Sequence, residues 1–280
     1  MRLDSIWLHP VKSMIGAAAQ AADLGVLGLV GDREWALRDL TTGGIANTRQ
    51  TPGIMRLTAS GDASAVMITL PDGSSVRSSD PDVDAVLSAA LGRAVSLVAR
   101  RPADDTEFYR RPAPPADAPP VDLMATLRDI FAREADEPLP DFTKFAPEVM
   151  EFETPPGTFV DCYPLLVMTT SAMQSLRAAV PDSVIDVRRF RPNLVVDTGD
   201  EPGHPELGWA GRRFRIGEAE IEIVNDCPRC AAITKEIAPD IPADRAILRH
   251  VVRDLGQAVG AYARVTTPGR VAVGDPLVAL

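Results

Sequence analysis

The sequence is poor in the residues that build covalent or membrane-bound scaffolds. It holds three cysteines in 280 residues, too few for a disulfide framework, which leaves the cytoplasm as the expected location. No apolar run approaches the length of a spanning helix, and the amino terminus lacks the basic and apolar regions of a signal peptide. We therefore expect no membrane partner.

Lysine is also scarce, since the 29 Lys and Arg residues include only Lys12, Lys144 and Lys235 as lysines, and the net charge is −10. An excess of negative charge disfavours binding to nucleic acid or to an anionic membrane. The arginines, however, gather in two groups, at 188–191 and 212–215. Such groups in an acidic protein indicate either local anion recognition by guanidinium forks or solvated strand edges.

The first hundred residues predict a mostly β domain. Short alternating apolar segments are separated by turn residues throughout residues 1–100. One helix is expected within this region, with Asp80 as its N-cap and Gly92 as its end.

A change of composition follows. Prolines crowd residues 102–120, so we interpret 101–158 as a Pro-rich linker or insertion that carries a helix over 121–135 and forms a lid over a site. Buried strands and short helices return in 159–280. The fold class is therefore predicted as mainly β (α+β).

The pair Cys227 and Cys230 follows a predicted strand over 220–224. Arg229 lies next to Cys230, and a guanidinium favours the thiolate, which is the form that attacks electrophiles and binds metals. Zinc ligation, a redox disulfide and small residues at a strand end are the other interpretations. Zinc would need a second pair of closely spaced ligands, and a thioredoxin-like disulfide would need a strand-to-helix setting; the sequence shows neither.

Several other residues could bind an anion. Some offer a cationic or amide side chain at a strand end, and three form a turn at a predicted helix start, where free N–H groups and the helix dipole suit phosphate. A surface lysine or a plain helix cap would explain each one alone. These residues are Lys12, Ser13, Arg33, Thr169, Thr170, Ser171, Arg191 and Asn193.

Short motifs in a fixed order connect these residues to a family. They are Pro10-Val11-Lys12-Ser13, Gly31-Asp32-Arg33, Arg49-Gln50, Tyr163-Pro164-Leu165-Leu166, Phe190-Arg191-Pro192-Asn193, Cys227-Pro228-Arg229-Cys230 and Val273-Gly274-Asp275-Pro276-Leu277. The set resembles a MOSC-domain protein with a MOSC N-terminal β-barrel domain, and it is similar in character to the amidoxime-reducing component family. The resemblance implies a β-barrel-like domain over 1–100 and a MOSC β-barrel with short flanking helices over 159–280.

The resemblance also implies a cofactor. In that family the second cysteine of the pair, here Cys230, ligates the molybdenum of a molybdopterin cofactor and is the catalytic residue; a soft thiolate suits this metal. The site is expected between the two domains. The implied cofactor-binding residues are Lys12, Ser13, Arg33, Arg49, Thr169, Thr170, Ser171, Arg191, Asn193 and Arg229.

The implied function is an oxidoreductase that reduces small N-hydroxylated or N-oxide substrates. The sequence has no dinucleotide fingerprint and no iron–sulfur cysteine set, so electrons are expected from a separate flavin or iron–sulfur reductase. Two alternatives stay open: a sulfur-transfer or cofactor-carrier protein that uses a persulfide or ligand at Cys230, and a non-enzymatic anion-binding barrel. Cys162 and the segment 231–237 depart from the family pattern.

Overall fold

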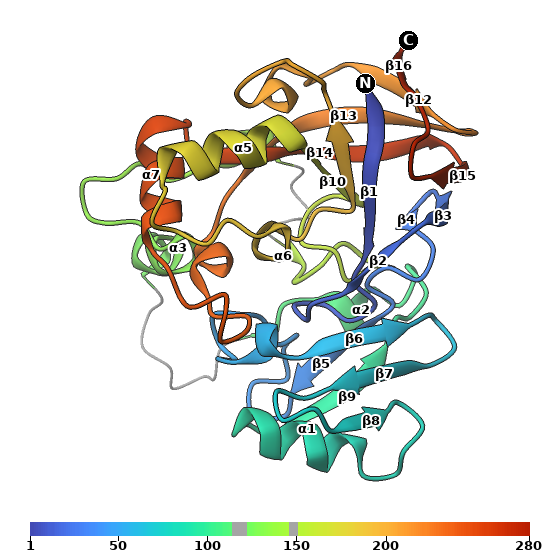
Figure 1. The fold of residues 1–280 in the computed structure, drawn as a ribbon. Helices are drawn as coiled ribbons and strands as arrows, with labels where there is room; N and C mark the ends of the chain where they lie inside the picture. Colours follow the sequence, from blue (N-terminus) through green and yellow to red (C-terminus); the bar gives the residue numbers. More distant parts are fainter. Residues whose placement is uncertain (114–121, 146–150) are drawn as a thin grey trace.

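The structure is a computed structural model that describes residues 1–113, 122–145 and 151–280 (Figure 1). Its helices are α1 (Val83–Leu91), α2 (Thr106–Tyr109), α3 (Leu123–Phe131), α5 (Thr170–Ala179), α6 (Val187–Phe190) and α7 (Ala246–Asp254), with the 3-10 turns η1 (Ile54–Arg56), η2 (Phe142–Lys144), η3 (Pro205–Gly208) and η4 (Ala231–Thr234). Its strands are β1 (Arg2–Leu8), β2 (Ala17–Ala19), β3 (Ala21–Gly25), β4 (Gly28–Leu29), β5 (Trp35–Asp39), β6 (Thr58–Gly61), β7 (Val66–Thr69), β8 (Ser75–Arg77), β9 (Val95–Ala99), β10 (Leu165–Thr169), β11 (Leu194–Asp197), β12 (Arg213–Ile216), β13 (Ala219–Pro228), β14 (Ala258–Thr267), β15 (Gly269–Ala272) and β16 (Leu277–Ala279). Strands predominate over helices, as the sequence predicts.

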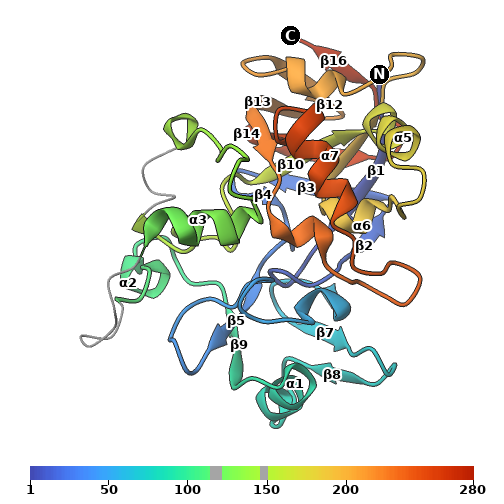
Figure 2. The same ribbon diagram turned by 90° about the vertical axis from the view of Figure 1, so that its left-hand side faces the viewer.

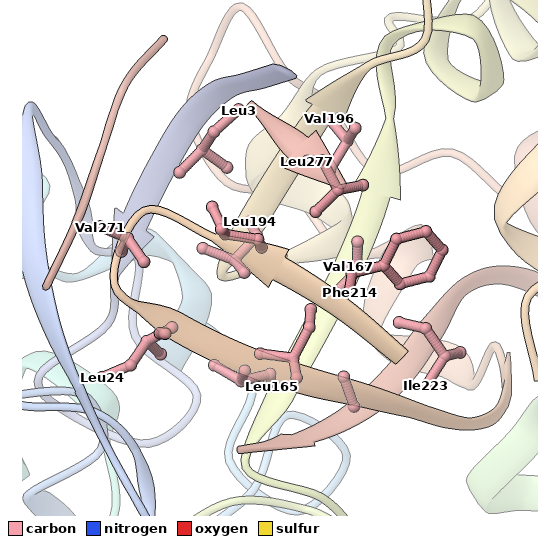
Figure 3. Close-up of a cluster of buried hydrophobic side chains, with 14 of the residues drawn as sticks. Leu3, Leu24, Leu165, Val167, Leu194, Val196, Phe214, Ile223, Val271 and Leu277 are labelled. Carbon is pink, nitrogen blue, oxygen red and sulfur yellow. The ribbon is translucent and has the colours of Figure 1, made fainter. Parts of the chain in front are cut away.

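The largest sheet has eight strands in the order β16-β12-β13-β14-β10-β11-β1-β2. All neighbours are antiparallel except β10 and β11, which are parallel and joined through α5. Leu165 and Val167 alternate along β10 toward the same core as Leu194 and Val196 of β11, which is what a period of two produces on one face (Figure 3). Burial of these apolar side chains fixes the register of the sheet.

The first strand belongs to this sheet rather than to a separate N-terminal unit. β1 lies between β11 and β2, and β3 pairs with β15 from the end of the chain. Leu3 and Ile6 are fully buried in the core that the C-terminal strands build. The residues that follow β1 therefore start at the C-terminal half and cross to the N-terminal one.

A second core holds β5, β9, the sheet β6-β7-β8 and α1 (Figure 1). Val11 and Met14 enter it from the segment after β1, and Ile237 and Ile241 enter it from the segment after η4. Both crossings tie the halves together, so the two cores are held at a fixed relative position by buried apolar contacts.

The predicted helix near residue 80 is present with a corrected start. α1 begins at Val83 with Asp82 as its N-cap, because Asp80 is used in the preceding turn, where its carboxylate accepts the N–H of Arg77 at 2.8 Å. Gly92 ends the helix in the left-handed conformation, as predicted.

The insertion packs against both halves over its described residues (Figure 2). Tyr109 and Phe159 are fully buried, with Ala36 and Ile45 of the N-terminal half in the same cluster. A series of contacts between aromatic rings leads from Phe131 of the insertion to Tyr262 of the C-terminal half. The centroid separations are 5.6, 6.4 and 6.5 Å along Phe131–Phe142–Phe145–Tyr262. A lid over the site stays a prediction, and residue 121 of the expected helix lies outside the described residues.

Within the described part of the chain, no helix combines the length and the apolar character needed to cross a bilayer.

Candidate functional site

The site lies where four segments meet between the two cores, and it is built around Cys230. This residue caps the first turn of η4, is half-buried, and is a reduced thiol, as are Cys162 and Cys227. Burial raises the pKa of Cys230; the N–H of Ala232 lowers it, and the nearby carboxylate of Asp161 raises it further. We call Lys12, Arg33, Asp161, Arg191 and Cys230 the central cluster.

Arg229 does not serve Cys230 in the way the sequence suggested. Its Nη1 donates to Cys227 Sγ at 3.1 Å and its Nη2 donates to the carbonyl of Phe190 at 2.7 Å. The side chain is buried, and its Nε has no hydrogen-bond partner among the described residues. Its charge lowers the pKa of Cys230, but by less than burial raises it. The guanidinium therefore holds Cys227 and ties the cysteine turn to α6.

Lys12 and Asp161 form the open side of the central cluster. The ammonium of Lys12, 6 % exposed, donates to the carbonyl of Phe159 at 3.2 Å and pairs with the Asp161 carboxylate. Asp161 is 81 % exposed as a side chain. The protein packed around the carboxylate raises its pKa, yet the charges of Lys12, Arg33 and Arg191 outweigh this and lower it to about 2. Asp161 is thus an accessible, ionised carboxylate among cations.

Sequence reasoning missed Asp161. Its one signal was its place directly before Cys162, ahead of a buried strand, and that pattern does not reveal a partner 149 positions away.

Arg33 and Asn193 belong to one hydrogen-bonded network with Asp32. The Asp32 carboxylate pairs with Arg33, accepts Nδ2 of Asn193 at 3.0 Å and accepts the N–H of His9 at 2.6 Å. Nη1 of Arg33 donates to Oδ1 of Asn193 at 3.3 Å. The same Oδ1 accepts the N–H of Leu166 at 3.2 Å, so the amide joins both halves of the molecule.

His9 is a neutral imidazole that connects two backbone segments beside the central cluster. Its Nδ1 accepts the N–H of Gly16 at 3.1 Å, so Nε2 carries the proton and donates to the carbonyl of Pro192 at 3.2 Å. Burial lowers the pKa of His9 well below its usual value, and Arg191 and Arg33 lower it further. This imidazole holds the segment after β1 against the entry to β11.

The backbone is strained where these segments meet. Ser13, Arg33 and Arg191 have φ angles of 66°, 50° and 56°, in the left-handed region that non-glycine residues rarely adopt. Such conformations persist where the surroundings enforce them, and they gather at functional sites. Arg33 and Arg191, from two of these segments, lie close enough for their charges to interact.

Arg191 completes the cationic side of the central cluster. Its Nη1 donates to the carbonyl of Met14. Burial, reinforced by the charge of Arg33, lowers the pKa of Arg191 to about 9, although Asp161 and Asp32 oppose this. Crowded guanidinium groups of this kind are stabilised when an anion binds between them.

Four predicted cofactor residues are not brought to the central cluster. Thr169 and Ser171 are buried and bond to Glu206 and Thr198, and Thr170 begins α5; among the described residues no hydrogen bond joins these three to the central cluster. Arg49 pairs instead with Asp129 of α3 at 3.1 Å. Lys12, Arg33, Arg191 and Asn193 do converge, and Ser13 is buried next to Lys12 in the chain.

Thr169 has a structural partner, which yields a test. Its hydroxyl donates to the fully buried Glu206 at 2.7 Å and accepts the N–H of Ala172 at 3.1 Å. Thr169→Val should destabilise the fold by about 1–3 kcal/mol, because a buried carboxylate loses a donor, and should lower Tm by roughly 3–10 °C. Thermal unfolding and metal content measured together check this. Loss of metal at an unchanged Tm would instead mean that Thr169 contributes to the cofactor site.

A metal-bearing pterin phosphate fits the residues present. The central cluster has a half-buried thiol for a soft metal and cations from three segments for a phosphate, and the neighbouring Arg229 has a buried Nε without a partner among the described residues. Among the described residues, no group of three or more His, Cys, Asp and Glu is placed to hold a metal ion. Ligation through one protein thiol, with the cofactor's own sulfurs as the other ligands, needs no such group.

Comparison with known proteins assigns both halves of the chain. The MOSC N-terminal beta barrel domain matches residues 1–105 and the MOSC domain matches residues 155–278. Mitochondrial amidoxime reducing component 2 is 23 % identical in Macaca fascicularis, over 97 % of this chain and 81 % of that protein, and 21 % identical in Bos taurus, over 98 % and 82 %.

Solved structures match more distantly. The YuaD protein of Bacillus subtilis has a TM-score of 0.45 at 10 % identity, over 99 % of this chain and 94 % of its own. YiiM of Geobacillus stearothermophilus has a TM-score of 0.31 at 19 % identity, over 42 % and 54 %. The two family matches, together with the ordered motifs, show that the chain belongs to the MOSC-domain proteins that carry a MOSC N-terminal β-barrel domain.

Proposed function

We propose that this protein is a cytoplasmic oxidoreductase that binds a molybdenum–molybdopterin cofactor through Cys230 and reduces N-hydroxylated or N-oxide substrates. The observation that carries the proposal is the half-buried Cys230 thiol in a cluster with Lys12, Arg33 and Arg191. The named activity of the relatives, amidoxime reduction, supplies the substrate class.

Each residue of the central cluster has a defined task in this proposal. Lys12, Ser13, Arg33 and Arg191 bind the anionic groups of the cofactor, and Asn193 keeps Arg33 oriented. The bound cofactor would supply two-electron redox chemistry, for which the protein provides binding, orientation and electrostatics. The electrons come from a separate flavin or iron–sulfur reductase.

Asp161 would act on the substrate side. Reduction of an amidoxime takes up two electrons and two protons, releases water, and leaves an amidine, which is a cation at neutral pH. An accessible carboxylate that stays ionised can hold that cation. A cavity of about 220 Å³ shares Asp32, Arg33 and Phe159 with this region and could take a small organic group.

The role of Asp161 gives a pH-dependent prediction. Its depressed pKa means that the carboxylate is fully charged above the ordinary carboxyl range and loses its charge only as the pH falls through about 2. Inhibition by benzamidine, an amidine product, should therefore show no titration of Asp161 between pH 5 and 8. Asp161→Asn should weaken this inhibition by roughly fivefold, as expected for about 1 kcal/mol at an exposed pair. Unchanged inhibition would remove Asp161 from the substrate site.

The proposal as a whole is tested on protein made in a cofactor-competent host. We expect about one molybdenum per chain, a fluorescent pterin after oxidation, and reduction of benzamidoxime with a chemical electron donor. Molybdenum far below one atom per chain, together with an absence of pterin fluorescence, would rule the proposal out.

A second candidate is sulfur transfer or cofactor carriage. Cys162 and Cys227 lie close to each other: burial, then the charge of Asp161, then Cys227 raise the pKa of Cys162 to about 12. Neighbouring thiols of this kind could pass a sulfane sulfur to Cys230. A persulfide mass on Cys230, with no benzamidoxime turnover, would favour this function.

A further inference from the structure

The insertion sends one buried arginine to the peptide that precedes Cys230. Arg133 follows α3 and is 6 % exposed. Its Nη2 donates to the carbonyl of Arg229 at 3.1 Å, and its Nη1 donates to the carbonyl of Phe131 at 2.5 Å. The Arg229 carbonyl belongs to the peptide bond that joins Arg229 to Cys230, so Arg133 touches the turn that presents the thiol.

Gln257 holds the other side of the same turn. Its Oε1 accepts both Nε and Nη2 of Arg133, each at 3.2 Å, and its main-chain carbonyl accepts the N–H of Arg229 at 2.9 Å. Gln257 directly precedes β14 and has a φ of 76°, in the left-handed region. The N–H and the C=O of Arg229 are therefore both fixed, by two residues that also bind each other.

The insertion has its own anchor that does not involve this turn. Arg249 of α7 donates to the carbonyl of Ala132 and pairs with the buried Glu137. Arg253 adds a second contact to Glu137 at 3.4 Å. The insertion is thus attached to α7 without any need for Arg133 to be buried.

Burial of Arg133 is costly. Its described hydrogen bonds go to carbonyl and amide oxygens. Removal from water lowers its pKa to about 10, with Glu137 opposing and Arg249 adding to that effect. A side chain needed only to attach the insertion could pair with a carboxylate at the surface, as Arg49 does with Asp129. The buried position of Arg133 indicates that the cysteine turn requires the hydrogen bond that Arg133 donates to it.

We propose that Arg133 is a positioning residue that, with Gln257, fixes the direction in which Cys230 presents its sulfur to the central cluster. The physical basis is the planarity of the peptide bond: holding its carbonyl fixes the plane from which the Cα–Cβ bond of Cys230 projects. A ligand sulfur must be held to within about 0.5 Å to bind its metal productively. The inference deepens the proposed function and rests on it for the identity of the metal.

The test compares Arg133→Met with Arg249→Met as a matched control. Both variants remove one arginine from the contact between the insertion and the C-terminal half, but only Arg133 touches the cysteine turn. In metal-free protein we measure hydrogen exchange of peptides covering 226–234 and the rate of alkylation of Cys230 by iodoacetamide at one fixed pH. In protein as isolated we measure molybdenum per chain and its rate of loss.

Arg133→Met should change exchange in the turn, the alkylation rate and the rate of metal loss by roughly tenfold each. Arg133→Lys should recover part of the effect, because one ammonium cannot reach both the Arg229 carbonyl and Gln257. Arg249→Met should leave all three within about twofold while it lowers Tm. Equal effects of the Met variants at both positions would overturn the proposal and make Arg133 an anchor.

Two further measurements keep the outcome decisive. If Arg133→Met fails to fold, Gln257→Gly takes its place, since glycine keeps the left-handed backbone and removes the side-chain amide, which accepts from Arg133 and donates to the Leu139 carbonyl at 3.4 Å; an unchanged Cys230 alkylation rate in that variant would overturn the proposal. If the parent protein holds no molybdenum, the proposed cofactor is refuted. The positioning role is retained if the alkylation rate of Cys230 nevertheless changes in Arg133→Met and not in Arg249→Met.

Discussion

Cys230→Ser is expected to abolish benzamidoxime reduction and to remove molybdenum, while Tm stays within a few degrees of the parent. A serine hydroxyl has nearly the size of the thiol but is a hard, protonated oxygen, a poor ligand for a metal that takes soft thiolates. Cys230 is half-buried at the start of η4, so little packing is lost. Metal analysis, turnover and thermal unfolding on the same preparation provide the measurement.

The matched control is Cys227→Ser. Cys227 is buried and accepts from Nη1 of Arg229, so the hydroxyl can take over the hydrogen bond and the loss is mainly one of packing. We expect most of the molybdenum and activity to survive. Equal losses at Cys227 and Cys230 would mean that the two thiols act as a pair, and Cys230 would no longer be the sole ligand.

Arg191→Ala is expected to lower cofactor occupancy by roughly ten- to a hundredfold, which corresponds to about 1.5–3 kcal/mol for a charged hydrogen bond. The guanidinium lies among Arg33, Asp161 and Asp32, and a bound phosphate would stabilise its charge against burial. Molybdenum and pterin content per chain, measured at limiting cofactor supply, check the result.

The backbone of Arg191 calls for a second variant. Its φ of 56° strains an alanine as well as an arginine, so Ala mixes a lost guanidinium with a strained backbone. Arg191→Gly relieves the strain and removes the same group, and it should lose as much cofactor as Ala. Arg191→Lys should recover only part, because a point charge lacks the fork. Full occupancy in the glycine variant would make Arg191 structural.

The main elements and part of the central cluster follow from local sequence patterns. Continuous apolar runs located β10 and β11, and period-two alternation located β13, because a strand buried on both faces is apolar throughout and a strand with one buried face alternates. α1 ends at Gly92 in the left-handed conformation, as the glycine at that position predicted. Motif order in turn identified Lys12, Arg33, Arg191, Asn193 and Cys230, since each lies at a strand end where side chains are free to converge.

The N-cap at Asp82 was decided by a local turn that occupies Asp80, whereas the place of β1 was decided by longer-range contacts. β1 joins the C-terminal sheet because only there do Leu3 and Ile6 find a complementary apolar surface and its edges find partners. The strand itself is readable from alternation, but its neighbours in the sheet are not, since pairing partners lie 195 positions apart, as Arg2 and Asp197 do.

The sequence by itself determined that this is a mainly β protein and singled out a cysteine and candidate anion-binding residues, because periodicity, caps and short motifs are local. Tertiary structure alone decided which polar groups meet around the cysteine. Asp161 and Arg133 joined the site, Thr169 turned toward Glu206, and Arg229 turned to Cys227. The reason is that a buried charge or hydroxyl takes the nearest partner in space, and that partner is set by how the strands cross, not by its position along the chain.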